Sequence, residues 1–478
     1  MRFAVWLMVV LAAAAPRAFA QALPDLGGVD MALSPQMERR IGENIMREIH
    51  QDAAYVDDAE TEDYLQSLGS RLVQANPNAR QEFQFFVLRD RTINAFALPG
   101  GFIGVHTGLI LVADTESELA SVLAHEIGHV SQRHIARMLS QQDRLQMPVM
   151  VALAAALLLG RSRPDLAIGA AAAAQGGAVQ TSLAYSRDFE READRVGLQT
   201  LENAGFDPRA MAAFFEKLQR STRLSDDSTF PGWLRDHPMT TERIADVQNK
   251  AAAMPYHQHA DTVDFQLVRA KLRAQSGDAA DSVASFEAAL HEHRYASEAA
   301  ARYGLASALL RAGRAPDAGR ELERLRSLGV ASPMIDMLAA RVRQAAGDAA
   351  GANRIYAEAQ KRYPYSRALA YAYITSLQDG GSNDAALAAI GQSLKLYPRD
   401  SRLYALQAKT YAALGKRLLQ HSSQGEAYAL QGSLPAAIEQ LQLARSAGDG
   451  DFYQLSVIDA RLKELRSQYA VEMKEAKR

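Results

Sequence analysis

The sequence contains no cysteine among its 478 residues. Disulfide bonds, cysteine-ligated metal sites and lipid attachment at a cysteine are therefore excluded. Folding must depend on buried apolar side chains and on any metal that other residue types hold. The content of hydrophobic residues, 48%, and of charged residues, 23%, is ordinary for a globular protein. A chain of this length predicts two or three domains.

The chain also lacks an excess of either charge. It has 53 basic and 55 acidic side chains, and without residues 1–20 the numbers are 51 and 55. This balance gives no indication of a nucleic-acid interface, so we expect no nucleic-acid partner.

Long apolar runs are missing as well, and the run at the start is too short for a membrane anchor. Arg2 is followed by an apolar core from Val5 to Ala15, and Ala18-Phe19-Ala20 has the form of a cleavage site. About twenty apolar residues are needed to span a membrane. Residues 1–20 therefore predict a cleavable signal peptide, and we expect a periplasmic protein that begins at Gln21.

The most informative stretch is His125-Glu126-Ile127-Gly128-His129. Thr115 and Glu118 have the spacing of a capping box, and apolar residues recur at helical spacing after them, so we predict a helix over residues 115–140. Residues four apart lie on one helix face, so His125 and His129 can bind one metal ion while Glu126 projects beside them. This pattern is typical of zinc hydrolases. His134 lies on a different face of such a helix and is expected at the surface or in a supporting position.

A catalytic zinc ion has three protein ligands and keeps a fourth position for water, so the histidine pair needs a third ligand. Glu190 and Asp194 lie four apart in a second predicted helix. We predict that Glu190 is the third ligand and that Asp194 orients a ligating imidazole or donates a proton. The alternative for Glu190 is a solvated helix carboxylate. A purely structural zinc site is disfavoured, because such sites usually have four ligands and prefer cysteine.

Together, the histidine motif and Glu190-Arg191-Glu192-Ala193-Asp194 resemble the M48 family of zinc metallopeptidases, of the gluzincin type. The segment 94–109, with its Pro99-Gly100-Gly101 turn, and the box 237–244 resemble the same family. The resemblance implies an α+β fold, in which a mostly helical peptidase domain with a small sheet occupies residues 21–255. It also implies one Zn²⁺ per chain.

The same resemblance implies residue roles. His125, His129 and Glu190 are expected to bind zinc, Glu126 to act as general base, and Asp194 to support catalysis. His237 is expected either to stabilise the oxyanion of the tetrahedral intermediate or to occupy the fourth zinc position and silence the enzyme. The residues alone indicate only a helix N-terminus at this point, with proline at its first position.

Alternating apolar residues predict short strands over residues 83–88, 95–98 and 102–105. In zincins an edge strand lies along the cleft, where an extended substrate can add as a further strand. If this sheet does the same, the substrate is a polypeptide.

Residues 149–179 form the most unusual stretch by composition. Val149 to Leu159 is wholly apolar, and an alanine- and glycine-rich stretch follows from Leu166 to Val179. Each run is too short to span a membrane. Three interpretations remain: a pair of buried helices, a mobile lid over the cleft, or a hairpin that contacts a membrane surface or a client.

The rest of the chain, residues 262–478, is repetitive. Five glycines are separated by 36, 34, 34 and 34 residues, close to the period of tetratricopeptide repeats; they are Gly277, Gly313, Gly347, Gly381 and Gly415. A last unit around Gly432 comes early, so the array is irregular at its end. Helix pairs of this kind stack into a curved solenoid whose concave side can hold a peptide.

These observations favour an exported zinc metalloendopeptidase with a client-binding repeat array. The resemblance implies that its substrates are misassembled outer-membrane β-barrel proteins and that its partners are the barrel-assembly machinery. The alternative is a chaperone or assembly adaptor in which the repeats are the main activity and proteolysis is minor or gated.

Overall fold

The computed structural model describes residues 33–140, 187–223 and 233–475. The described residues are mostly helical with one small sheet, which confirms the predicted α+β class. The predicted signal peptide and the segment 149–179 lie outside the described residues. None of the described helices is both long and apolar enough to cross a membrane.

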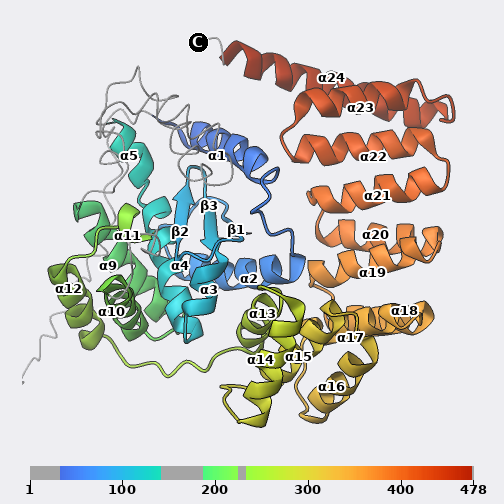
Figure 1. Cartoon of the computed structure of the whole chain (residues 1–478). Coiled ribbons are helices and arrows are strands. Elements are labelled where there is room, and N and C mark those ends of the chain that lie inside the picture. The colour runs from blue at the N-terminus through green and yellow to red at the C-terminus, as the bar shows by residue number, and fades with distance from the viewer. Residues whose placement is uncertain (1–32, 141–186, 224–232, 476–478) are drawn as a thin grey trace, which may run out of the picture.

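The first part of the chain is built on a three-stranded sheet in the order β1-β3-β2. β1 (Gln84–Leu88) is parallel to β3 (Phe102–His106), whereas β2 (Ala95–Leu98) is antiparallel to it. The strand predictions are therefore right to within one residue. β2 is the edge strand that packs beside α4 (Glu116–Ser131) (Figure 1).

Helices surround this sheet and supply most of the core. In chain order they are α1 (Pro35–Ile49), α2 (Ala59–Ala75), α3 (Thr107–Val112), α4, α5 (His134–Ser140), α9 (Arg187–Asn203), α10 (Arg209–Arg223), α11 (Trp233–Asp236) and α12 (Thr241–Ala253). α4 is buried from Glu116 to Val130. A helix that is covered on all sides needs small or apolar residues around its whole circumference, as residues 119–124 have, and its buried polar residues need partners.

Two predicted helix boundaries are wrong. The helix predicted over 115–140 ends at Ser131, because Arg133 adopts a left-handed conformation (φ 55°), and α5 starts at His134. The helix predicted to start at Pro238 begins at Thr241, where the side chain of Thr240 accepts the N–H of Arg243 and caps the helix.

The second part of the chain consists of helices that pair and stack, which confirms the predicted solenoid. They are α13 (Val263–Ala274), α14 (Ala279–His291), α15 (Glu298–Arg311), α16 (Ala315–Ser327), α17 (Pro333–Ala345), α18 (Ala349–Arg362), α19 (Arg367–Asp379), α20 (Asn383–Leu396), α21 (Ser401–Ala413), α22 (Arg417–Leu430), α23 (Leu434–Arg445) and α24 (Phe452–Glu475). Each of the repeat glycines, Gly432 included, has a positive φ of 64° to 83° in the turn between two helices. That conformation suits glycine because it has no Cβ.

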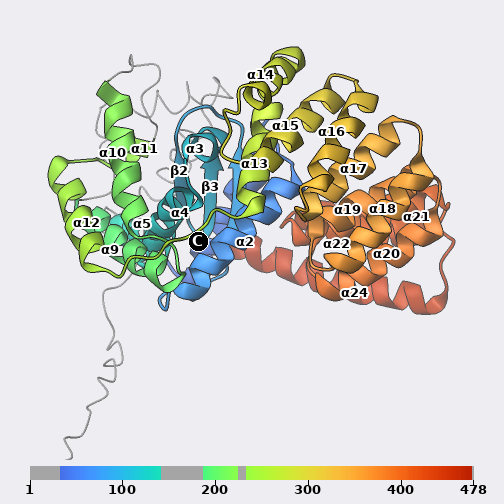
Figure 2. The same ribbon diagram turned by 90° about the horizontal axis from the view of Figure 1, so that it is seen from below.

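The solenoid curves around the acidic start of α2, as the two views together indicate (Figures 1 and 2). Lys271 of α13 lies 2.6 Å from Asp58 and also contacts Glu60, and Arg341 of α17 contacts Glu60 at 3.0 Å. The Asp63 carboxylate accepts the backbone N–H of residue 368 at the start of α19. The hydrophobic core continues across this junction, since apolar residues of α2 and α13 belong to one cluster. The proposed boundary between residues 255 and 262 therefore stays a prediction.

We expect the Lys271→Met change to weaken this junction. The side chains of Lys271 and Glu60 are only 5% and 2% exposed, so removal of the ammonium group leaves buried carboxylates short of a cation. Such a change should lower the free energy of unfolding by about 3 kcal/mol. Urea denaturation followed by circular dichroism measures it. The control is Lys361→Met, which removes an exposed ion pair with Glu358 and should leave the curve unchanged. Identical curves for the two variants would contradict this role of Lys271.

Candidate metal centre

α4 brings the two motif histidines together. The side chain of Thr115 accepts the N–H of Glu118 and fixes the start of the helix. From there, His125 and His129 follow one turn apart, and their Nε2 atoms lie 3.0 Å from each other. Both side chains are buried, with exposed fractions of 0% and 1%.

α9 crosses α4 closely and adds the carboxylates. A Cβ atom on Gly128 would lie 3.0 Å from the backbone oxygen of Ala193, and a Cβ on Gly197 would lie 3.2 Å from the backbone nitrogen of His125. These two glycines let the helix backbones approach. As a result, the carboxylate oxygens of Glu190 lie 3.5 Å from His125 Nε2 and 3.4 Å from His129 Nε2.

His237 reaches the same point from the end of α11. Its Nδ1 lies 3.3 Å from His125 Nε2 and 2.9 Å from a carboxylate oxygen of Glu190. The structure therefore joins three segments far apart in the sequence. One ligand atom from each of His125, His129, Glu190 and His237 falls within 4.8 Å of the others.

This cluster fits a metal ion by its chemistry and its spacing. In a tetrahedral zinc site with bonds of about 2.0–2.1 Å, the ligand atoms lie roughly 3.3 Å apart. The nitrogen–nitrogen and nitrogen–oxygen distances given above match that spacing. Two imidazole nitrogens that face each other also need either a proton or a cation between them, and a cation satisfies all four groups together.

Asp194 lies behind His125, on the side away from the cluster. Its Oδ1 is 3.0 Å from His125 Nδ1. A carboxylate only accepts, so we assign the proton of this ring to Nδ1, which leaves the Nε2 lone pair for a metal.

Arg243 of α12 neutralises the carboxylates of α9. Its Nε and Nη2 donate to the two oxygens of Asp194 at 2.6 and 2.8 Å, and its Nη1 lies 2.5 Å from Glu190. Arg243 is only 5% exposed. A bidentate pair of this kind holds a carboxylate in a single orientation.

Glu126 lies beside the cluster, and only one of its two carboxylate oxygens accepts a hydrogen bond among the described residues. Trp233 Nε1 donates to Oε1 at 3.0 Å, and His237 Nε2 lies 3.4 Å from the same atom. The other oxygen, Oε2, is buried and has no hydrogen-bond partner among the described residues. Burial raises the pKa of Glu126, although the charges of His237 and His125 and the Trp233 hydrogen bond oppose this. A carboxylate with a raised pKa is suited to accept and return a proton.

The pKa values of His125 and Glu190 are shifted too. Burial disfavours a charged His125, but the carboxylates of Asp194 and Glu190 raise the pKa of this ring to about 9. Burial works against an ionised Glu190, yet His237 and Arg243 hold its pKa well below the usual range. Glu190 is therefore held in its anionic form, the form in which a carboxylate can bind a metal ion, whereas a metal ion would have to displace a proton from His125.

Sequence reasoning missed two residues that shape this site. Trp233 and Arg243 come from segments more than a hundred residues after the motif helix, and their partners are visible only in the fold. Arg243 belongs to the box 237–244 that resembles the M48 family, but the sequence does not indicate that it pairs with Asp194 and Glu190.

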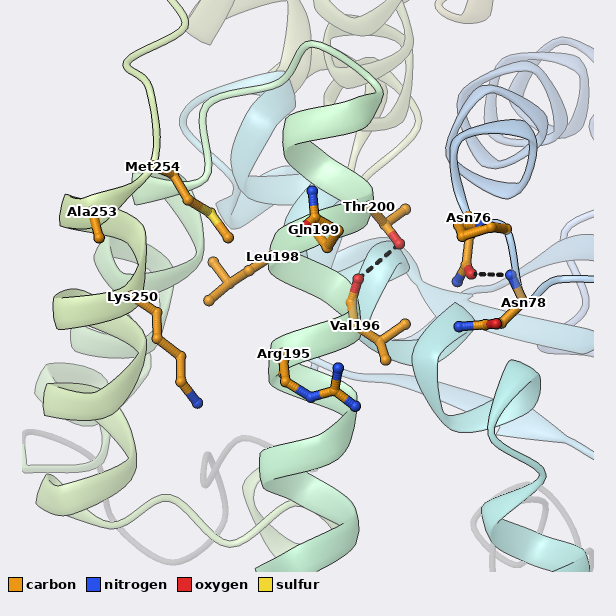
Figure 3. A pocket seen from close by; sticks show the side chains of 11 residues that line it. Asn76, Asn78, Arg195, Val196, Leu198, Gln199, Thr200, Lys250, Ala253 and Met254 are labelled. Atoms are coloured by element: carbon orange, nitrogen blue, oxygen red, sulfur yellow. Dashed lines mark hydrogen bonds between the residues drawn. The ribbon is translucent and has the colours of Figure 1, made fainter. Parts of the chain in front are cut away.

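A separate pocket lies along the outer side of α9 (Figure 3). Asn76 and Asn78 line one side of it, Arg195 and Gln199 come from α9, and Lys250 comes from α12. It shares no residue with the metal cluster.

Two crossing helices that join an HExxH pair to a carboxylate define the class of metallohydrolase centres. Residues 59–251 match the family model described as Peptidase family M48, so this part of the chain is a peptidase M48 domain, and the family implies a metal ion.

Named relatives agree with this assignment. The chain is 37% identical over 253 residues to the "Beta-barrel assembly-enhancing protease" of Escherichia coli strain K12, which covers 53% of this chain and 52% of the relative. The protein of the same name from Yersinia pestis is 34% identical over 305 residues, 63% and 62% of the two chains. The "Mitochondrial metalloendopeptidase OMA1" of Arabidopsis thaliana is 32% identical over 161 residues, which cover 34% of this chain and 30% of the relative. The chain thus spans about half to three fifths of the length of the bacterial relatives that it matches. The solved structure of a tetratricopeptide repeat protein of Parabacteroides merdae aligns at 15% identity over 53% of this chain and 98% of its own, with a TM-score of 0.29.

We expect Gly197→Leu to destroy the metal site. A side chain here would meet the backbone of His125 and push α9, with Glu190, away from α4. Metal per chain, measured by mass spectrometry after loading and desalting, should fall well below that of the unchanged chain. The control is Gly391→Leu in α20, where an added Cβ meets nothing within 4 Å. Equal metal content in both variants would show that the close crossing is unnecessary.

Proposed function

We propose that this chain is an exported zinc-dependent endopeptidase that acts on polypeptides. The observation that carries the proposal is Oε2 of Glu126, which is buried beside a cluster of three imidazoles and a carboxylate and has no hydrogen-bond partner in the described part of the chain. The proposed zinc ligands are His125, His129 and Glu190. Bound zinc would polarise the scissile carbonyl and lower the pKa of a bound water toward about 7.

In this proposal the chain's own residues hold and move protons. Glu126 accepts the proton of the attacking water at Oε2 and passes it to the leaving amine, while Trp233 keeps the carboxylate in place. Asp194 keeps His125 in the tautomer that binds metal, and Arg243 fixes Asp194. The edge strand β2 beside α4 offers an extended substrate a backbone partner.

The Glu126→Gln variant tests the function. Glutamine has nearly the same shape but cannot accept the proton, so casein cleavage should fall by roughly a hundredfold or more. Zinc content should stay at one per chain in both proteins. Equal cleavage by the unchanged chain and the Glu126→Gln variant would overturn the role of Glu126. Absence of bound zinc from both proteins would overturn the proposal that the chain is a zinc enzyme.

We further propose that His237 occupies the fourth position of the metal and closes the site. Its Nδ1 lies 3.3 Å from His125 Nε2 and 2.9 Å from a Glu190 oxygen, so it would be available as a fourth ligand, and all four cluster side chains are at most 2% exposed. The other role considered for His237, stabilisation of the oxyanion, requires it to leave this position first.

His237→Ala distinguishes the two roles. If His237 closes the site, the variant should cleave casein faster than the unchanged chain, by about tenfold if one bound ligand is the main barrier, which is about 1.4 kcal/mol. Steady-state rates at equal zinc loading measure the change. A decrease would contradict closure and favour the oxyanion role.

The name of the bacterial relatives, "Beta-barrel assembly-enhancing protease", supports a place in the assembly of β-barrel proteins. We therefore propose that residues 21–255 form the peptidase domain, that the repeats of 262–478 select clients, and that the protein works in the periplasm. The clients would be outer-membrane β-barrel proteins, and the partners would be the barrel-assembly machinery. Contact of residues 149–179 with a membrane surface stays a prediction.

A second candidate, a chaperone or assembly adaptor, is favoured by the closed state of the cluster. A site with four protein groups at the metal position is poised against hydrolysis, so the repeats could act alone. Refolding of an outer-membrane β-barrel protein in the presence of the Glu126→Gln variant tests this candidate. Protection equal to that of the unchanged chain would establish an adaptor role that does not require cleavage.

A further inference from the structure

A second imidazole lies directly behind one of the proposed zinc ligands. His134 Nδ1 is 2.9 Å from His129 Nδ1, while the other nitrogen of His129, Nε2, faces the metal cluster. His134 is fully buried, and its own Nε2 lies 3.1 Å from Oε2 of Glu192. Arg137 donates to the same oxygen at 2.8 Å. The four groups form a row from the cluster to the surface.

We propose that Glu192 and His134 are positioning residues that fix the tautomer of His129 and so strengthen metal binding. The proposal rests on the metal centre of the proposed function and adds to it a set of supporting residues.

The order of protons along the row follows from its outer end. A carboxylate only accepts, so His134 must carry its proton on Nε2, facing Glu192. A neutral imidazole then has a lone pair on Nδ1, which can accept the Nδ1–H of His129. The Nε2 of His129 is left with a lone pair that points at the metal position. Each ring of the row thus sets the next one.

The break after α4 makes this arrangement possible. Five residues along a continuous helix correspond to a rotation of about 140°, which would turn His134 away from His129. Instead, Arg133 adopts φ 55° and redirects the chain. Its guanidinium is held by the Leu33 backbone oxygen at 2.7 Å and by Glu38 at 3.1 Å. Left-handed conformations are unfavourable for residues other than glycine, so these contacts stabilise a bend that serves the site.

α9 also packs against the His134 ring. Phe189 stacks on His134 with ring centroids 4.5 Å apart and planes 9° from parallel. The helix α9 therefore contributes three groups. Phe189 stacks on His134, Glu190 is a proposed zinc ligand, and Glu192 contacts the outer nitrogen of His134.

Zinc affinity, measured by chelator competition on metal-free protein, tests the proposal without reference to cleavage. His134→Leu keeps a buried apolar group but removes the acceptor, and should weaken zinc binding by about ten- to a hundredfold. His134→Asn provides an oxygen close to the former Nδ1 and should restore affinity to within about threefold of the unchanged chain. A role in packing alone would not be rescued by asparagine.

The control is His259→Leu, which removes an imidazole that also contacts a carboxylate, that of Glu116, but touches no proposed ligand. It should leave zinc affinity unchanged. If His134→Leu does not fold, Glu192→Leu tests the inference instead, because this side chain is 26% exposed and its replacement disturbs the core less. About tenfold weaker zinc binding is expected.

Equal zinc affinity in the unchanged chain and in the folded leucine variants, His134→Leu and Glu192→Leu, would overturn the inference while leaving the proposed metal centre intact. No zinc binding by the unchanged chain would overturn the proposed function and this inference together.

Discussion

The close crossing of α4 and α9 is the constraint on which the metal centre depends. Gly128 and Gly197 remove side chains at the contact, so that Glu190 and Asp194 reach the two imidazoles of α4. In each of the two helices, the i, i+4 spacing places a pair of side chains on the face that meets the other helix. One pair supplies two imidazole nitrogens, and the other supplies a proposed ligand, Glu190, and the carboxylate proposed to orient His125, Asp194. Neither helix alone could form the site.

Burying three carboxylates at that crossing is costly unless cations compensate them. Arg243 lies against Asp194 and Glu190, and a metal ion would supply the remaining positive charge. The guanidinium thus compensates part of the negative charge of these carboxylates. α12, which contributes no proposed ligand, lies near the centre because it carries this compensating charge.

Much of this could be predicted from the sequence, and the rest could not, for identifiable reasons. Helical periodicity places His125 and His129 on one helix face and Glu190 and Asp194 on one face of a second helix, and the family resemblance predicts that the two pairs meet. The repeat glycines follow from a fixed period and a turn that needs positive φ. Trp233 and Arg243 act through contacts across more than forty residues, which no local pattern encodes. His134 was expected on another face because the helix was expected to continue. Nothing in the sequence marks Arg133 for a left-handed bend, since the contacts that hold it come from residues 33 and 38.

The repeat array is linked to the same centre through the linker before α13. The Glu116 carboxylate at the start of α4 accepts hydrogen bonds from Thr262 and lies 3.1 Å from His259, while its backbone N–H donates to Asp261. Helix α2, which packs against α4, also meets the cations on the inner side of the solenoid. The linker therefore contacts the start of α4, the helix that carries His125 and His129, and the repeats contact α2, which packs against α4. The core around α4 and the first repeats also belong to one hydrophobic cluster, so the candidate metal centre and the start of the repeat array are packed as one unit.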